Sequence, residues 1–173
     1  MSVEDVKRYL EAWGRGADVR EFPVSTATVE LAAAAVGVEG ARIAKTLTFK
    51  APDEEDAPDE EGAEGGFPAI SVVAAGDARI DGARYKQAFG VKSKMLSPEE
   101  ALAATGHLVG GVCPFAVANP LARIYLDESL RRFATVFPAC GSSNSCIEMT
   151  CDELFTTSKA RGWVDVCKGW REE

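Results

Sequence analysis

Helical spacing of apolar residues, bounded by capping signals, recurs five times along the chain. Each of these segments opens on a side chain that can accept a helical N–H or closes near a glycine that can turn the chain. The clearest start is Ser97-Pro98-Glu99-Glu100, with an N-cap serine, proline at the first helical position and glutamate at N3. The predicted helices run over Ser2–Trp13, Thr28–Val36, Asp81–Phe89, from Ser97 to Gly106, and from Thr150 to about Ala160.

Short apolar runs between these helices predict strands. Ala69–Ala75 (AISVVAA) is almost continuously apolar, which is typical of a buried strand. Further strands are expected at Val19–Phe22, Thr46–Phe49, Lys92–Leu96, Phe115–Ala118, Ile124–Leu126, Thr135–Phe137 and Ser145–Met149, the last pair joined by a turn at Gly141–Asn144. Because strands and helices interleave without a strict βαβ rhythm, the sequence predicts a mixed α/β (α+β) fold with helices around a mixed central sheet.

The length of 173 residues suits a single domain that can bury a core without disulfides, so we expect one domain over 1–173. No apolar run approaches the length of a membrane span, and the first residues lack the pattern of a secretion signal. The five cysteines are an odd number at irregular spacing, which favours reduced thiols. These observations predict a cytoplasmic protein that does not associate with membranes.

The net charge of −8 is concentrated in one segment. Eight of the 27 acidic residues lie between Asp53 and Glu64, where no base occurs, so the rest of the chain has 19 acids against 19 bases. Such a run cannot bury apolar surface, and we predict a flexible acidic loop at about 51–66. The near-neutral remainder allows local contact with the end of a nucleic acid, although not extensive electrostatic wrapping.

Two separate segments supply groups that can hold something anionic or polar. Lys45 is placed at the start of an apolar strand, and Gly110-Gly111 lies in a loop some sixty residues later. A lysine provides a cation, while glycines let backbone N–H groups come close to a ligand because no Cβ intervenes. Taken alone, Lys45 is better interpreted as a solvated lysine at a strand edge, and Gly110-Gly111 could be a tight turn and nothing more.

Other arrangements of reactive residues are less specific. His107 and Cys113 flank the glycine loop and could form a nucleophilic pair, but the signatures of cysteine hydrolases are absent. The spacing of Cys140, Cys146 and Cys151 lacks the tight pair that zinc sites use, so no metal is expected. The common hydrolase, phosphate-binding and dinucleotide-binding loop motifs are also missing.

Several ordered motifs together resemble the YbaK family, also called prolyl-tRNA synthetase-associated domains. These motifs are Ser25–Glu30 with Ala32–Val38, Ile43-Ala44-Lys45-Thr46-Leu47, Ser97–Glu100, Thr105–Pro114 with its Gly-x-x-x-Pro pattern, Leu126–Leu130 and Gly141–Asn144. They follow one another over about 120 residues, and such an ordered set is far more specific than any single motif.

The resemblance implies a trans-editing aminoacyl-tRNA deacylase, a hydrolase that removes a wrong amino acid from tRNA, chiefly tRNA for proline. It implies catalysis without a protein nucleophile or a cofactor: Lys45 would hold the terminal adenosine, and the amides of Gly110 and Gly111 would position the ester or stabilise the oxyanion. The implied substrate-binding residues are Thr28, Thr46, His107, Pro114, Gly141 and Asn144.

The expected partners are the acceptor end of a mischarged tRNA and a prolyl-tRNA synthetase that presents it. Relatives that act on alanine often carry asparagine after the lysine, whereas this chain has Thr46, which favours cysteine or another small amino acid over alanine alone. Two alternatives stay open: a non-catalytic module that binds a synthetase or tRNA, and a hydrolase that uses Cys113 and His107.

Overall fold

A computed structural model describes residues 2–51 and 67–172 of the protein. The acidic loop predicted at about 51–66 lies, apart from Ala51, outside the described residues. Five α-helices are present in the described part: α1 (Val3–Leu10), α2 (Val29–Val36), α3 (Gly82–Phe89), α4 (Pro98–Thr105) and α5 (Cys151–Ser158). All five coincide with predicted helices, although the first is continued by a 3₁₀ turn at Glu11–Trp13.

Capping side chains define where the helices begin. Ser2, Ser97 and Thr150 each close a capping box with an acidic residue at N3, in α1, α4 and α5. Glycines in the left-handed conformation end α2, α3 and α4. The local capping chemistry therefore accounts for the agreement between the predicted and observed helices.

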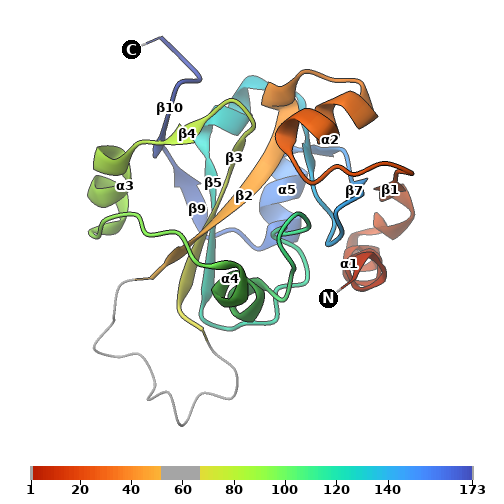
Figure 1. Cartoon of the computed structure of the whole chain (residues 1–173), viewed down its shortest axis with the longest axis horizontal. Coiled ribbons are helices and arrows are strands. Elements are labelled where there is room, and N and C mark those ends of the chain that lie inside the picture. Colours follow the sequence, from red (N-terminus) through yellow and green to blue (C-terminus); the bar gives the residue numbers. More distant parts are fainter. Residues whose placement is uncertain (1, 52–66, 173) are drawn as a thin grey trace.

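A six-stranded mixed sheet forms the centre of the molecule, in the order β8-β6-β2-β3-β5-β9. β2 pairs antiparallel with β3 and parallel with β6, while β3, β5 and β9 run parallel to one another. The strands are β2 (Ile43–Lys50), β3 (Ala69–Ala75), β5 (Ala122–Asp127), β6 (Thr135–Pro138), β8 (Met149–Thr150) and β9 (Gly162–Val164). The predicted mixed sheet surrounded by helices is confirmed (Figure 1).

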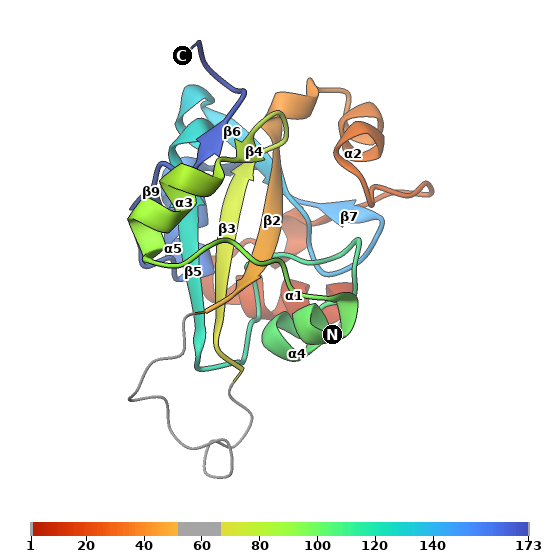
Figure 2. The same ribbon diagram turned by 60° about the vertical axis from the view of Figure 1, so that its left-hand side comes forward.

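Two short two-stranded ribbons are separate from this sheet. β1 (Arg20–Glu21) pairs with β7 (Ser145–Cys146), and β4 (Arg79–Ile80) pairs with β10 (Cys167–Lys168). The second ribbon brings the C-terminal segment beside the end of β3, as both views show (Figures 1 and 2).

Two predicted strands are wrong. Residues 92–96 make only an isolated bridge, between Met95 and Phe49, and residues 115–118 are a bend followed by irregular chain, with Ala116 at a positive φ of 57°. The predicted strand at 145–149 is divided into β7 and β8. Apolar residues in these segments pack as loops, because burial alone does not require a strand partner.

The sheet has a continuous apolar interior. Every residue of β3 is buried, as its apolar run predicted. On one side Tyr85 and Phe89 of α3 pack against Phe49 and Tyr125 of the sheet. α2 and α4 lie near opposite ends of β2 in both ribbon views (Figures 1 and 2).

Candidate functional site

A pocket of about 270 Å³ opens beside β2. Its wall comes from the loop before α2, from β2, from the start of α4, from the glycine loop and from β6 and β7. Among the described residues that line it, Lys45 alone is charged. The remainder are apolar or carry hydroxyls or a thiol: Thr26, Ala27, Thr28, Val29, Ala32, Ile43, Ala44, Thr46, Thr48, Met95, Leu96, Pro98, Ala101, Val109, Gly110, Val112, Phe137, Ala139, Ser145 and Cys146.

The loop before α2 is held against the pocket by backbone contacts. Thr26 N–H donates to the carbonyl of Ser143 at 2.6 Å, and Phe22 N–H donates to the carbonyl of Asn144 at 2.8 Å. Thr28 then caps α2 by accepting the N–H of Leu31 at 3.2 Å. This arrangement fixes one wall of the pocket without any charged side chain.

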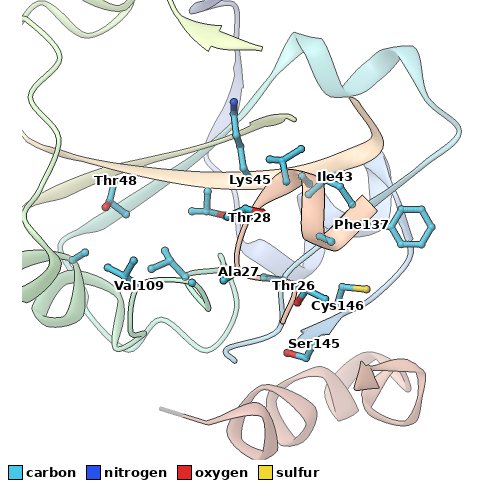
Figure 3. A pocket seen from close by; sticks show the side chains of 18 of the residues that line it. Thr26, Ala27, Thr28, Ile43, Lys45, Thr48, Val109, Phe137, Ser145 and Cys146 are labelled. Carbon is cyan, nitrogen blue, oxygen red and sulfur yellow. The ribbon is translucent and has the colours of Figure 1, made fainter. Parts of the chain in front are cut away.

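Lys45 lies at the edge of the pocket. Its Nζ donates to the carbonyl oxygen of Gly76 at 3.3 Å and also to that of Ala78. Figure 3 shows the side chain rising away from Thr26, Ala27 and Val109. Desolvation is the main cause that lowers the pKa of Lys45 from its ordinary value of 10.5. The cation is therefore partly desolvated and oriented by two carbonyl dipoles.

Gly110 forms part of the pocket wall next to the loop that precedes α2. Its φ is +94°, a conformation that favours glycine, and a Cβ would lie only 3.2 Å from Cβ of Ala27. Among residues 2–51 and 67–172, no acceptor takes the N–H of Gly110. A bare backbone donor is thus available beside the pocket.

Gly111 is placed differently from its neighbour. It is buried and is not part of the pocket lining. Its N–H donates to the carbonyl of Leu108 at 3.0 Å, and a Cβ would lie 2.8 Å from the carbonyl carbon of Gly141. Gly111 thus lets two backbone segments pack together, and its amide is already engaged.

The structure brings only some of the predicted binding residues into the pocket. Thr28 and Thr46 line it, and the buried Thr46 Oγ1 has no hydrogen-bond partner in the described part of the chain. His107, Pro114, Gly141 and Asn144 lie outside the lining. Of these four, Asn144 supports the loop before α2, because its Nδ2 donates to the carbonyl of Phe22 at 3.0 Å.

The pair formed by His107 and Cys113 is fully buried, with Sγ 3.4 Å from Nε2. Nε2 lies 2.8 Å from the carbonyl oxygen of Phe115, so this nitrogen carries the proton and donates it there. Burial raises the pKa of the Cys113 thiol to about 12 and lowers that of the His107 imidazole. A neutral thiol beside a nitrogen that is already a donor is a poor nucleophilic pair.

The five cysteines are free thiols, four of them buried. In the part of the chain that the structure describes, no group of three or more His, Cys, Asp or Glu side chains could hold a metal ion. None of the helices in that part has the length and apolarity that a membrane crossing requires.

Several lining residues were not singled out from the sequence. Thr48 follows Thr46 by two positions in β2, so strand alternation alone could have placed both on one face. Val109, Phe137 and Ser145 come from three distant segments. No local signal in the sequence marks them, because only the tertiary fold brings them together.

The chain belongs to the family of aminoacyl-tRNA editing domains, whose family model matches residues 24–157. This range contains every described residue that lines the pocket, from Thr26 to Cys146, so the whole site lies inside the matched domain. The resemblance to YbaK-like editing proteins is confirmed.

Individual relatives cover nearly the whole chain. It is 48% identical over 170 residues to "Uncharacterized protein YwhH" of Bacillus subtilis (strain 168), covering 98% of this chain and 99% of that protein. A crystal structure named "a putative trans-editing enzyme for prolyl tRNA synthetase" matches with a TM-score of 0.78 and 32% identity, covering 96% of this chain and 97% of that one. A scaffold protein used for epitope backbone grafting matches with a TM-score of 0.80, 28% identity and the same coverage.

Proposed function

We propose that this protein is a trans-editing aminoacyl-tRNA deacylase that hydrolyses the ester between a small, uncharged amino acid and tRNA, with tRNA for proline carrying cysteine or alanine as the main substrates. The observation that carries this proposal is the pocket itself. It combines an apolar, hydroxyl-lined interior, a single cation at its edge and a bare amide at Gly110. The family of the chain and the name of its structural relative support the same reaction class.

The pocket suits a small aminoacyl group. Its volume of about 270 Å³ is below the usual range of about 300–1,000 Å³ for ligand pockets. Its lining holds no carboxylate in the described residues, so a basic side chain would enter without a counter-charge. A second site of this kind can remove amino acids that a synthetase cannot reject by packing alone, since a missing methylene is worth only about 1–3 kcal/mol.

Lys45 fits a role toward the tRNA backbone. Its ammonium group sits at the pocket edge and is directed toward the turn at 76–78, so it would meet a phosphate or ribose outside the pocket while the aminoacyl group lies inside. The N–H of Gly110 would then face the ester carbonyl, where it can stabilise the developing oxyanion. Gly111 contributes the close backbone packing that holds this loop.

Hydrolysis in this scheme needs no protein nucleophile. A water molecule attacks the ester carbonyl, the bond from the carbonyl carbon to the ribose oxygen breaks, and the ribose hydroxyl leaves with a proton. With a cysteinyl ester, the substrate's own thiol can attack the carbonyl first: a C–S bond forms, the bond to the ribose oxygen breaks and the ribose oxygen takes the thiol proton. Water then opens the resulting thioester to give free cysteine. Catalysis then rests on positioning and on electrostatic stabilisation.

A deacylation panel tests this proposal. Purified protein is incubated with tRNA for proline charged with alanine, cysteine, serine, threonine or proline, and the release of amino acid is followed. We expect release from at least one small, mischarged substrate and little release of proline. Binding of the charged tRNAs without turnover on any of them would instead support a non-catalytic tRNA-binding module.

A further inference from the structure

The turn between β3 and β4 binds the ammonium group of Lys45. Gly76 and Ala78 supply the two carbonyls that accept hydrogen bonds from Lys45 Nζ, and Asp77 lies between them. An ammonium group has three N–H donors, so this grip leaves one for a ligand. The position of the turn therefore decides where the remaining donor points.

Arg132 also holds this turn, through the carboxylate of Asp77. Its two terminal nitrogens donate to both carboxylate oxygens of Asp77, Nη1 to Oδ2 at 2.9 Å and Nη2 to Oδ1 at 2.6 Å. Its Nε donates to the carbonyl of Ser129, and Nη1 also donates to that of Trp170. The guanidinium further packs 5.1 Å from the centre of the Trp170 ring. A two-pronged contact of this kind fixes orientation as well as distance.

The backbone on both sides of Asp77 is also constrained. A Cβ on Gly76 would lie 2.1 Å from the carbonyl oxygen of Gly40, so the turn packs directly against that segment. Ser129 Oγ accepts the N–H of Ala75 at 3.1 Å, just before the turn. β4 is paired with the C-terminal strand β10 just after it. Arg132 is thus one of four contacts that fix the turn, together with those of Gly76, Ala75 and β4.

We propose that Arg132 and Asp77 form a positioning pair that sets the location of the Lys45 ammonium group through the carbonyls of the turn at 76–78. The pair does not touch the pocket, and neither residue is part of its lining. The inference rests on the proposed function only for its effect on turnover, because the placement of Lys45 can be measured without any tRNA.

Four groups surround the lysine electrostatically, each from a different element. Asp77 of the turn and Glu30 of α2 favour the protonated form, Arg79 of β4 disfavours it, and Cys167 of β10 would favour it only as a thiolate. Burial raises the pKa of the Cys167 thiol to about 12, so this group stays neutral at ordinary pH. Asp77 is therefore the acidic neighbour that both bears charge and belongs to the grip.

Substitution of Asp77 and substitution of Arg132 should change the pKa of Lys45 in opposite directions. Asp77→Asn keeps an oxygen for Arg132 but removes a negative charge near the ammonium group, so the pKa of Lys45 falls. Arg132→Met frees the turn, lets water reach the ammonium group and leaves the Asp77 charge in place, so the pKa of Lys45 rises toward its ordinary value. Arg131→Met is the matched control, because Arg131 pairs with Glu128 and stacks on Trp163 away from the turn.

The experiment is a titration of Lys45 in each full-length variant made with ¹³C-labelled lysine, followed at the Cε signal, which leaves all three N–H donors in place; the Lys45 signal is assigned by its loss in Lys45→Arg. We expect a fall in Asp77→Asn, a rise in Arg132→Met and no change in Arg131→Met. An unchanged titration in both Asp77→Asn and Arg132→Met, or a shift in the same direction in both, would overturn the proposal.

Turnover provides a second readout. We expect Arg132→Met to lower kcat of deacylation about tenfold with a smaller change in KM, and Arg132→Lys to recover little, because an ammonium cannot replace the guanidinium fork. Wild-type kcat in Arg132→Met would overturn the link to catalysis. Shifted titrations together with a wild-type protein that releases no amino acid would support the positioning pair and contradict the proposed function.

Discussion

The two sides of the pocket are built by different means. On the Lys45 side, a charged side chain is held by carbonyls from a turn, and that turn is held in place by Arg132 and the C-terminal strand. On the Gly110 side, the wall is made of backbone that packs closely on Ala27 and Gly141 with no charged group. The structure of the Lys45 side therefore depends on charge and on hydrogen-bond orientation, and that of the Gly110 side depends on close backbone packing.

The two glycines of this loop, Gly110 and Gly111, have different structural roles. Gly110 has a positive φ and an unengaged N–H beside the pocket, whereas Gly111 uses its N–H within the loop and its missing side chain to approach Gly141. Substitution of Gly110 should therefore lower the activity, whereas substitution of Gly111 should lower the stability.

The largest effect in this comparison is expected for Gly110→Ala. The added Cβ would lie 3.2 Å from Cβ of Ala27, and the alanine would have to adopt a φ of +94°. The loop and the N–H of residue 110 would therefore shift. Because misplacement of about 1 Å can lower a rate about 100-fold, we expect a comparable loss of kcat/KM in the deacylation assay. Gly90→Ala is the control, with a φ of +79° but no neighbour within 4 Å and no place in the pocket. Full activity of Gly110→Ala would remove this amide from the mechanism.

Gly111→Ala should act on stability instead. Its Cβ would lie 2.8 Å from backbone atoms of Gly141 and Ser142, which cannot move as a side chain can. Overpacking of this kind costs about 1–3 kcal/mol, so thermal unfolding should show a Tm lower by roughly 2–12 °C. Gly82→Ala, which meets nothing within 4 Å, should leave the Tm unchanged. An unaltered Tm for Gly111→Ala would show that the loop and the turn at 141–142 do not pack tightly.

A smaller effect is expected at low pH for Asp77→Asn. The hydrogen bonds from Arg132 lower the pKa of the Asp77 carboxyl below its ordinary value of 3.8. Its contribution to stability is therefore complete above that value and is lost as the pH falls through the lowered pKa. Because the pair is partly exposed, we expect less than about 1 kcal/mol. Chemical denaturation at pH 7 and at pH 3 should show a smaller pH-dependent difference in the variant than in the wild type.

The smallest effect is expected from thiol alkylation. Burial raises the pKa of Cys113 to about 12, so very little reactive thiolate is present at pH 8. Cys151, which is partly exposed, should react first. Treatment of the folded protein with iodoacetamide should therefore leave deacylation intact, as mass spectrometry and activity measured on one sample would show. Loss of activity that tracks modification of Cys113 would favour the cysteine-dependent mechanism.

Local signals in the sequence predicted the helices and the central strands well. Capping residues such as Ser97 and Thr150 act within one turn of the chain, so their effect can be inferred without knowledge of the fold. The strands predicted at 92–96 and 115–118 were wrong, because a run of apolar residues shows that a segment is buried and does not show what it pairs with. The strands β4, β9 and β10 were missed because two or three residues are too few to show the alternation or apolar run that marks a strand.

The candidate site was predicted only in part. Lys45, Thr28, Thr46 and Gly110 do line one pocket. The turn at 76–78 and Arg132 lie 31 or more residues from Lys45 in the sequence, and nothing in their local pattern links them to it. The orientation of the ammonium group toward that turn likewise depends on tertiary contacts that sequence spacing does not encode.

The most direct test compares wild type, Lys45→Met and Lys50→Met in the release of amino acid from mischarged tRNA for proline. Lys50 is the matched control, since it lies on the same strand, outside the pocket, and pairs with Glu100 at 3.6 Å. We predict release by the wild type and by Lys50→Met, and a loss of about 100-fold or more in Lys45→Met with little change in Tm. Equal release by Lys45→Met and the wild type would contradict the proposed role of this cation.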